Sequence, residues 1–244
     1  MKLTSTELTD YIGKSITEFH LKRIEKIKNI KLNDVIRRKN PYMFKAKGIE
    51  TAEQFVRAVI DAYISSSEET LFGDFSENLA RFICESEKNG YKSSCEGIDI
   101  EFTENNIRYL VSLKSGPNWG NSSQVKKMID NFKKAIKTLR TQNQGINIRC
   151  VNGCCYGKDN CPDKGEYLKY CGEVFWYFVS GEQDFYLKIL KPLEKEAKEK
   201  NKMFVEEYAK IVNLLTKEFL NNFCKDDGTI DWEMVVKFNS AARI

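Results

Sequence analysis

The chain is poor in histidine: its 244 residues include one, His20. Two-histidine zinc sites and nucleases with a histidine base need more imidazoles, or one within a recognisable motif. No pattern of Cys, Ser or carboxylates surrounds His20, so we interpret it as a structural residue. The sequence also lacks a serine-nucleophile motif, a Gly-rich phosphate loop with its Lys and a dinucleotide fingerprint. These absences exclude a hydrolase triad and leave no motif for nucleotide binding.

Long apolar runs are missing as well, since no stretch approaches the roughly 20 residues that cross a bilayer. The first ten residues lack the pattern of a signal peptide, so we expect a cytoplasmic protein without membrane contact. With 41% hydrophobic and 30% charged residues, the composition is that of a globular protein with a substantial core. We expect one domain over residues 1–244, with a helical N-terminal part (1–68), a catalytic core (69–180) and a helical C-terminal part (181–244).

Basic residues are concentrated in two segments, although the net charge is only +4. Residues 21–48 contain ten Lys or Arg against two acids, and residues 126–140 contain six against one. Such concentrations suit a polyanionic partner. Two solvated helix faces would give the same pattern, so charge alone leaves both interpretations open.

Two segments with alternating apolar and polar residues, 95–102 and 106–116, predict a β-hairpin, with turn residues between them. Residues two apart on a strand share a face. Asp99 should therefore lie with Glu101, while Ile98, Ile100 and Phe102 take the other face.

The second strand of this hairpin places Leu110, Ser112 and Lys114 on one face by the same argument. An acid near the middle of one strand and a lysine at the end of its neighbour can meet at one edge of the sheet. We therefore expect Asp99 and Lys114 to lie close together.

Apolar residues at helical spacing predict helices in the rest of the chain. Asn121 or Ser122 should cap the helix that follows the hairpin, and with Asn121 as the cap Gln124 would complete a capping box. A strand over 146–156 comes next, so the order of elements predicts an α/β domain with a mixed sheet. Residues 172–180 suit a short strand or a buried helix. The expected helices cover 4–13, 16–35, 51–64, 69–87, 122–142 and 184–224, the last with a break near Asn201, and residues 37–48 are expected to form a loop.

Five of the eight cysteines fall in one segment of the sequence. Their spacing lacks the paired Cys-x-x-Cys units that are typical of zinc sites. We interpret them as small buried thiols, with a structural zinc site as the alternative. They are Cys150, Cys154, Cys155, Cys161 and Cys171.

Asp99, Glu77 and Lys114 could supply metal-assisted phosphodiester hydrolysis. Mg²⁺ takes one or two carboxylates and completes its shell with waters and substrate oxygens, so Asp99 and Glu77 are candidate ligands. Lys114 could orient or deprotonate water, or stabilise the charge on phosphorus. The alternative is a cross-strand ion pair between Asp99 and Lys114, worth under about 1 kcal/mol and without chemistry.

The run Glu-Gly-Ile-Asp-Ile-Glu-Phe (96–102), followed by Tyr-Leu-Val-Ser-Leu-Lys-Ser-Gly-Pro-Asn-Trp-Gly-Asn-Ser-Ser-Gln (109–124), resembles the core of PD-(D/E)xK type II restriction endonucleases. It is especially similar to the TdeIII/MjaII-type group, and the resemblance extends through 153–157 and 172–176. The resemblance implies a restriction-endonuclease-like core, a mixed β-sheet flanked by helices, with extra helices at both ends of the chain. It also implies a Mg²⁺-dependent homodimer that cuts double-stranded DNA at a short palindrome. GGNCC is the typical target of the group, and a cognate DNA methyltransferase acts on the same site.

Residue by residue, Asp99 matches the first acid of the family motif, Lys114 its lysine and Glu77 a helix acid found in many members. Ser112 departs from the motif, which has Asp or Glu two residues before the lysine. A serine hydroxyl supplies no charge to Mg²⁺, so the second ligand must come from elsewhere. We prefer Glu77; the other possible ligands are Glu101, Gln124, Asp130 and the hydroxyl of Ser112 itself.

The basic segments would then hold DNA phosphates, and base contacts would come from loops. The departure at Ser112 keeps two other functions open: a catalytically inactive DNA-binding or regulatory protein, and a repair or junction nuclease of the same fold. The candidate DNA-binding residues are Arg37, Arg38, Lys39, Asn118, Lys126 and Lys127.

Overall fold

The computed structural model describes residues 2–142 and 145–242. Its strands are β1 (Ile100–Glu104), β2 (Ile107–Lys114), β3 (Asn147–Cys154) and β4 (Leu168–Cys171). Its helices are α1 (Ser5–Lys28), α2 (Leu32–Arg37), α3 (Pro41–Ala46), α4 (Ala52–Lys88), α5 (Ser122–Gln142), α6 (Glu173–Ser180), α7 (Phe185–Lys188), α8 (Leu190–Phe223) and α9 (Trp232–Ser240).

The chain divides into two compact units. The first, here the sheet unit, comprises residues 1–16 and 72–196 and contains the strands together with α5, α6 and α7. The second, here the helical unit, comprises residues 17–71 and 197–244 and contains α2, α3 and α9. The long helices α1, α4 and α8 contribute residues to both units. A single domain over all 244 residues stays a prediction.

The sheet is mixed, with the strand order β1-β2-β3-β4. β1 and β2 pair antiparallel as the predicted hairpin, whose two-residue turn has positive φ at Asn105 (48°) and Asn106 (65°). Asparagine tolerates this backbone conformation, which is why it is common in tight hairpins. β2–β3 and β3–β4 pair parallel, and α5 connects β2 to β3. The predicted α/β class with a mixed sheet flanked by helices is therefore confirmed; β4 was not predicted.

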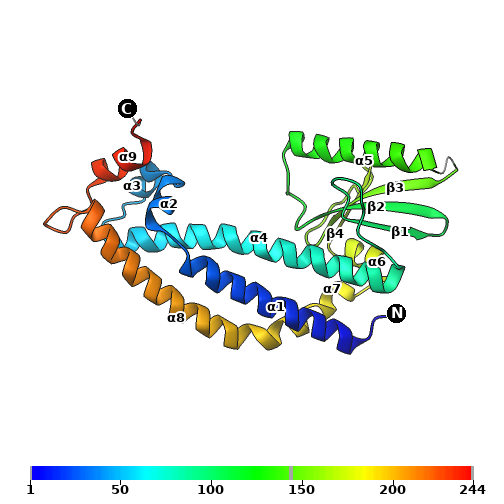
Figure 1. Ribbon diagram of the computed structural model, residues 1–244, viewed down its shortest axis with the longest axis horizontal. Coiled ribbons are helices and arrows are strands. Elements are labelled where there is room, and N and C mark those ends of the chain that lie inside the picture. Colours follow the sequence, from blue (N-terminus) through cyan, green and yellow to red (C-terminus); the bar gives the residue numbers. More distant parts are fainter. Residues whose placement is uncertain (1, 143–144, 243–244) are drawn as a thin grey trace. The chain divides into compact units, whose positions relative to one another are not determined.

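Helices cover both faces of the sheet (Figure 1). On one face, α5 packs Met128 and Phe132 against Leu110 and Cys150. The other face is covered by the C-terminal part of α4 and by α6. That larger core includes Ile100, Val111, Leu113 and Val151 from the strands and Phe75, Leu79, Ile83, Phe175 and Val179 from the helices.

The expected helix breaks at Gly13, Ser65 and Asn201 are wrong, because α1, α4 and α8 run through them. Buried residues recur every three or four positions on both sides of Gly13, so burial outweighs the cost of about 1 kcal/mol for a helical glycine. Hydroxyl side chains are accommodated in α4 by hydrogen bonds to the carbonyl four residues earlier. Thr70 Oγ1, for example, donates to the carbonyl of Ser66 (3.1 Å). In the expected loop 37–48, α3 forms instead, capped by Asn40. Residues 172–180 contain a helix, α6, with buried Phe175, Trp176 and Val179.

The predicted face of Ile98 is also wrong. Ile98 packs with Leu110 and α5, whereas Ile100 and Phe102 pack on the opposite face of the sheet. The alternation is broken because β1 begins at Ile100: the N–H of Asp99 donates to the carbonyl of Val111 (2.8 Å), although Val111 is the register partner of Ile100.

Candidate active site

Asp99 is fixed against the end of β2, immediately before β1. Besides the bond from its own N–H to Val111, its carboxylate Oδ2 accepts from the N–H of Leu113 (2.7 Å). Lys114 is the next residue and the last of β2. The hairpin thus brings Asp99 next to the strand end that carries Lys114, as its alternating sequence predicts.

Glu77 reaches the same place from α4. Gly73 lies one turn earlier on this helix, and a Cβ built there would stand 3.6 Å from Cβ of Ser115, directly after β2. Burial raises the pKa of Glu77 above its usual 4.5; the charge of Asp99 raises it further, and the Lys114 ammonium lowers it. The structure therefore brings together the three side chains singled out as catalytic.

Within residues 2–142 and 145–242, the Lys114 ammonium lies within 4.0 Å of no carboxylate oxygen. The simple Asp99–Lys114 ion pair considered above does not form. Lys114 Nζ instead lies 5.3 Å from the ring centroid of Trp119, in the loop after β2. Lys114 is half-buried. The Lys114 ammonium therefore acts on Glu77 through its charge without forming an ion pair with it.

Glu77 and Asp99 form a pair of carboxylates that act on each other through their charges. Mg²⁺ typically takes one or two protein carboxylates and keeps several waters, so this pair suits Mg²⁺. Within the described part of the chain, no group of three His, Cys, Asp or Glu side chains could hold a metal ion. This applies also to the cysteines of 150–171, of which all but the exposed Cys161 are buried free thiols.

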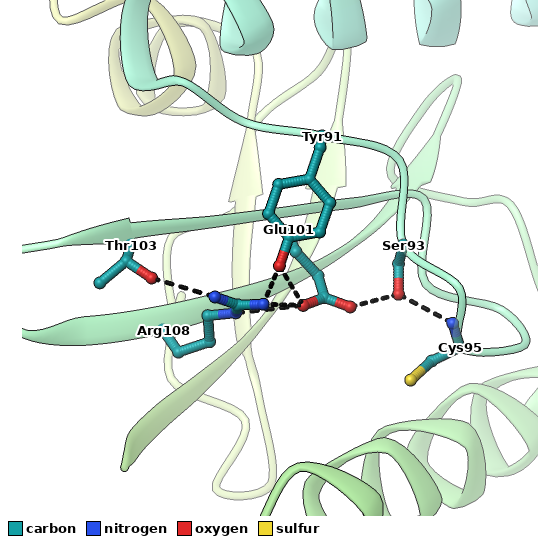
Figure 2. A network of polar contacts seen from close by, with 6 residues as sticks. All are labelled: Tyr91, Ser93, Cys95, Glu101, Thr103 and Arg108. Atoms are coloured by element: carbon teal, nitrogen blue, oxygen red, sulfur yellow. Dashed lines mark hydrogen bonds and ion pairs between the residues drawn. The ribbon is translucent and has the colours of Figure 1, made fainter. Parts of the chain in front are cut away.

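Glu101 serves a different network (Figure 2). Its carboxylate is 3% exposed and accepts from Arg108 Nη2 (2.7 Å), Arg108 Nε (3.1 Å) and the hydroxyls of Tyr91 and Ser93. Ser93 also accepts from the N–H of Cys95 (3.0 Å), so the network ties β1 and β2 to the loop before the hairpin. Every carboxylate oxygen of Glu101 is thus already in use.

The other residues considered as Mg²⁺ ligands are buried, bonded to other groups or exposed on α5. Ser112 is 3% exposed near the end of β2, so burial shields its hydroxyl from a hydrated Mg²⁺ ion, and its backbone carbonyl accepts from the side chain of Asn152 (3.2 Å). Gln124 forms the predicted capping box: its Oε1 accepts from the N–H of Asn121 (2.9 Å), and Asn121 Oδ1 accepts from the N–H of Gln124 (3.1 Å). Asp130 lies exposed on α5. Among the acids, Asp99 has the largest effect on the pKa of Glu77, which it raises.

The candidate DNA-binding residues lie in both units. Lys126 and Lys127 are exposed on α5, and Asn118 is exposed in the loop before it. Exposed bases continue along α5 at Lys133, Lys134, Lys137 and Arg140, so this helix has a basic outer face. In the helical unit, Arg37 and Arg38 are exposed, with Arg37 5.0 Å from the ring of Phe238, and Lys39 donates to the carbonyl of Ala62 (3.3 Å).

Two residues beside Lys114 were not singled out from the sequence. Trp119 contacts the ammonium, and its indole Nε1 donates to Oδ1 of Asn152 (3.0 Å). Asn152 is fully buried in β3, directly opposite Ser112. β3 has other polar residues at Asn147 and Arg149, so its sequence does not single out Asn152, and only the parallel pairing of β2 with β3 shows which residue Asn152 meets.

The match to known proteins is consistent with this geometry. No curated protein matches the chain. None of the helices described here has the length and apolar character needed to cross a membrane. The family model of type II restriction endonuclease EcoO109I matches residues 6–201, which is most of the 244-residue chain and includes Glu77, Asp99 and Lys114. The chain therefore belongs to the EcoO109I family of type II restriction endonucleases, enzymes that cleave DNA.

Proposed function

We propose that this protein is a Mg²⁺-dependent type II restriction endonuclease that cleaves double-stranded DNA at a short palindromic site. The observation that carries the proposal is the convergence of Glu77, Asp99 and Lys114 from α4, the start of the hairpin and the end of β2. Membership of the EcoO109I family supports DNA cleavage. The motif resemblance to the TdeIII/MjaII-type group makes GGNCC the first target to test.

Glu77 and Asp99 would hold Mg²⁺, which neutralises charge on the phosphate and makes water more acidic when it is bound. Asp99 presents its carboxylate in a fixed direction because Oδ2 accepts from Leu113. Burial and the charge of Asp99 raise the pKa of Glu77 despite the Lys114 ammonium, so a bound Mg²⁺ would offset an unfavourable carboxylate charge. Lys114, one residue beyond Leu113, would stabilise the negative charge that develops on the phosphate oxygens, or orient the attacking water.

Digestion of phage DNA with Mg²⁺, followed by sequencing of the fragment ends, tests the proposal. We expect discrete fragments whose ends share one short palindrome. The variants Asp99→Asn and Lys114→Met should lose cleavage by several orders of magnitude while DNA binding, measured in Ca²⁺, survives. DNA binding without cleavage by the wild type at any Mg²⁺ concentration would support an inactive scaffold instead, and preferential cutting of branched DNA would support a junction nuclease.

The choice of Glu77 as the second ligand is tested by single substitutions. Glu77→Gln should abolish Mg²⁺-dependent cleavage, because it removes one of the two carboxylates that act on each other. Asp130→Asn is the matched control, since Asp130 is exposed on α5, and it should cleave as the wild type does. The reverse pattern would move the ligand role from Glu77 to Asp130.

A palindromic target also implies a two-fold symmetric enzyme. We therefore propose that the protein acts as a homodimer in the cytoplasm, beside a methyltransferase that protects the same DNA site. Analytical ultracentrifugation of the free protein and of its complex with a palindromic duplex tests the dimer; one protomer per duplex would contradict it.

A further inference from the structure

We propose that Trp119, held in place by Asn152, is a positioning residue that sets the direction of the Lys114 ammonium. This inference rests on the proposed function, because it assigns Lys114 to the reaction. It concerns Trp119 and Asn152, to which neither the family match nor the motif argument gives a role.

Asn152 is the anchor of the arrangement. Its side chain is fully buried, and both ends of its amide are bonded: Nδ2 donates to the carbonyl of Ser112 (3.2 Å), and Oδ1 accepts from Trp119 Nε1 (3.0 Å). The indole N–H can only donate and a carbonyl can only accept, so the two bonds together fix which way the amide points. Asn152 therefore fixes the indole of Trp119 relative to β2 and β3.

The indole of Trp119 is fixed from a second direction by packing. It is half-buried against the core between α5 and the sheet, which contains Ile98, Leu110 and Met128. A ring held by a buried hydrogen bond at its N–H and by apolar contacts at its body has little freedom to turn. It offers a rigid aromatic face at the end of β2.

Lys114 lies against this face, with Nζ 5.3 Å from the ring centroid and thus within the usual range of a cation–π contact. A lysine side chain is flexible and keeps many rotamers when nothing holds its end. No described acid lies within ion-pair distance of this ammonium, so the face of the indole is the group that lies against its charge. Such a contact directs the ammonium toward the site of Glu77 and Asp99 while leaving its N–H donors available to a phosphate.

A positioning role predicts a loss in the chemical step rather than in DNA binding. The experiment compares single-turnover cleavage at saturating Mg²⁺ and DNA affinity in Ca²⁺. We expect Trp119→Leu to cleave on the order of 10²-fold more slowly, the usual effect of displacing a reacting group by about 1 Å, with unchanged affinity. Trp119→Phe keeps an aromatic face and should lose less, which separates this role from misfolding. Tyr177→Leu, at an exposed aromatic residue of α6, is the control and should cleave normally.

A second measurement is independent of cleavage. Lysines carrying ¹³C-methyl groups after reductive methylation give separate NMR signals, and Lys114→Arg identifies the signal of Lys114. We expect this signal to be shifted upfield by the indole ring in the wild type, to return to the ordinary lysine position in Trp119→Leu and to stay partly shifted in Trp119→Phe. If the wild type cuts no DNA, the proposed function fails while the NMR result still decides the contact.

Three outcomes would overturn the positioning role of Trp119. An unshifted Lys114 signal in the wild type would remove the contact itself. Wild-type cleavage by Trp119→Leu would show that the contact does not matter to the reaction. A loss of DNA affinity at an unchanged cleavage rate would make Trp119 a DNA-binding residue.

Discussion

Glu77 carries an unfavourable charge in the folded chain. Its pKa is raised by burial and by Asp99, so the folded state favours the protonated carboxyl. The stability that this group contributes is therefore present below its unfolded pKa, near 4.5, and is lost as the pH rises through the raised value. Side chains at active sites often have such shifted pKa values, because they are placed for a reaction rather than for stability.

The variant Glu77→Gln should therefore be more stable than the wild type at pH 8 in the absence of divalent metal, and no more stable at pH 4. Thermal unfolding at the two pH values measures the difference in Tm. Glu85→Gln, at an exposed position of the same helix, is the matched control and should show no such dependence on pH. A Gln variant less stable than the wild type at pH 8 would contradict the unfavourable charge.

His20 makes the stability of the protein depend on pH in the opposite direction to Glu77. Burial, then the charge of Arg23, lower its pKa below the usual 6.5, with a smaller effect of Lys200 and an opposing one of Glu68. Its Nδ1 is buried without a hydrogen-bond partner in the described part of the chain. The folded state thus favours the neutral ring, and stability is lost as the pH falls from about 6.5 through the lowered value.

We expect urea denaturation at pH 7.5 and pH 5.5 to show a smaller loss of unfolding free energy in His20→Leu than in the wild type. Leucine removes both the titrating group and the unsatisfied nitrogen. An equal loss in both proteins would assign the acid sensitivity to other groups. Either result also tests whether His20 is structural, as its surroundings in the sequence indicate.

At the scale of elements, the hairpin and α5 were the most predictable parts of the fold. Alternation, turn residues and a capping box are local signals, and β1, β2 and the start of α5 follow them. Helix ends were less predictable. Gly13 and Ser65–Ser67 lower the intrinsic stability of a helix, but burial of apolar side chains elsewhere on the same helices outweighs this cost. The partners of Glu101 and Asn152 were not predictable, since they depend on which strands pair and which loops return.

The sequence of the hairpin places Glu101 on a strand but does not reveal which residues it contacts. From alternation it shares a strand with Asp99 and resembles a second metal ligand. In the structure it is almost completely buried and paired with Arg108, whose guanidinium also contacts Tyr91 and Thr103 (Figure 2). The network therefore joins β1, β2 and the loop that leads to Asp99.

Breaking this network should destabilise the protein strongly. Arg108→Gln leaves the Glu101 carboxylate buried without its cation, which typically costs about 3 kcal/mol of unfolding free energy. The double variant Glu101→Gln with Arg108→Gln should recover part of the loss. Lys133→Gln is the control: it breaks an ion pair with Glu166 whose side chains are 56% and 55% exposed, so it should lower the unfolding free energy much less than Arg108→Gln does. Equal losses in Arg108→Gln and Lys133→Gln would contradict the role of the buried network.

For the molecule as a whole, the proposed reacting groups belong to the sheet unit, whereas candidate DNA contacts occur in both units. Among the candidate contact surfaces, the basic outer face of α5 follows Lys114 closely in the sequence. Lysines that bind phosphates release counterions, so their contribution appears in the salt dependence of affinity and not in sequence preference.

The double variant Lys126→Gln with Lys127→Gln should therefore bind every DNA sequence more weakly. The slope of log affinity against log salt, measured in Ca²⁺, should fall by about 2, near 0.9 per lost phosphate contact. Lys217→Gln is the control, because Lys217 is exposed on α8 and lies outside both basic segments of the sequence, and it should leave the slope unchanged. An unchanged slope in the double variant would show that this end of α5 makes no phosphate contact.

The burial of Ser112 has a consequence for how such an enzyme could be re-engineered. Restoring the common family motif with Ser112→Asp looks like a one-step repair, yet position 112 is 3% exposed and lies opposite the fully buried Asn152. A carboxylate there would be desolvated, so we expect Ser112→Asp to unfold more readily at pH 8 than at pH 5 and to cleave no faster. Packing between β2 and β3 leaves no solvated space for a carboxylate at position 112, so an acid there would require changes on both strands at once.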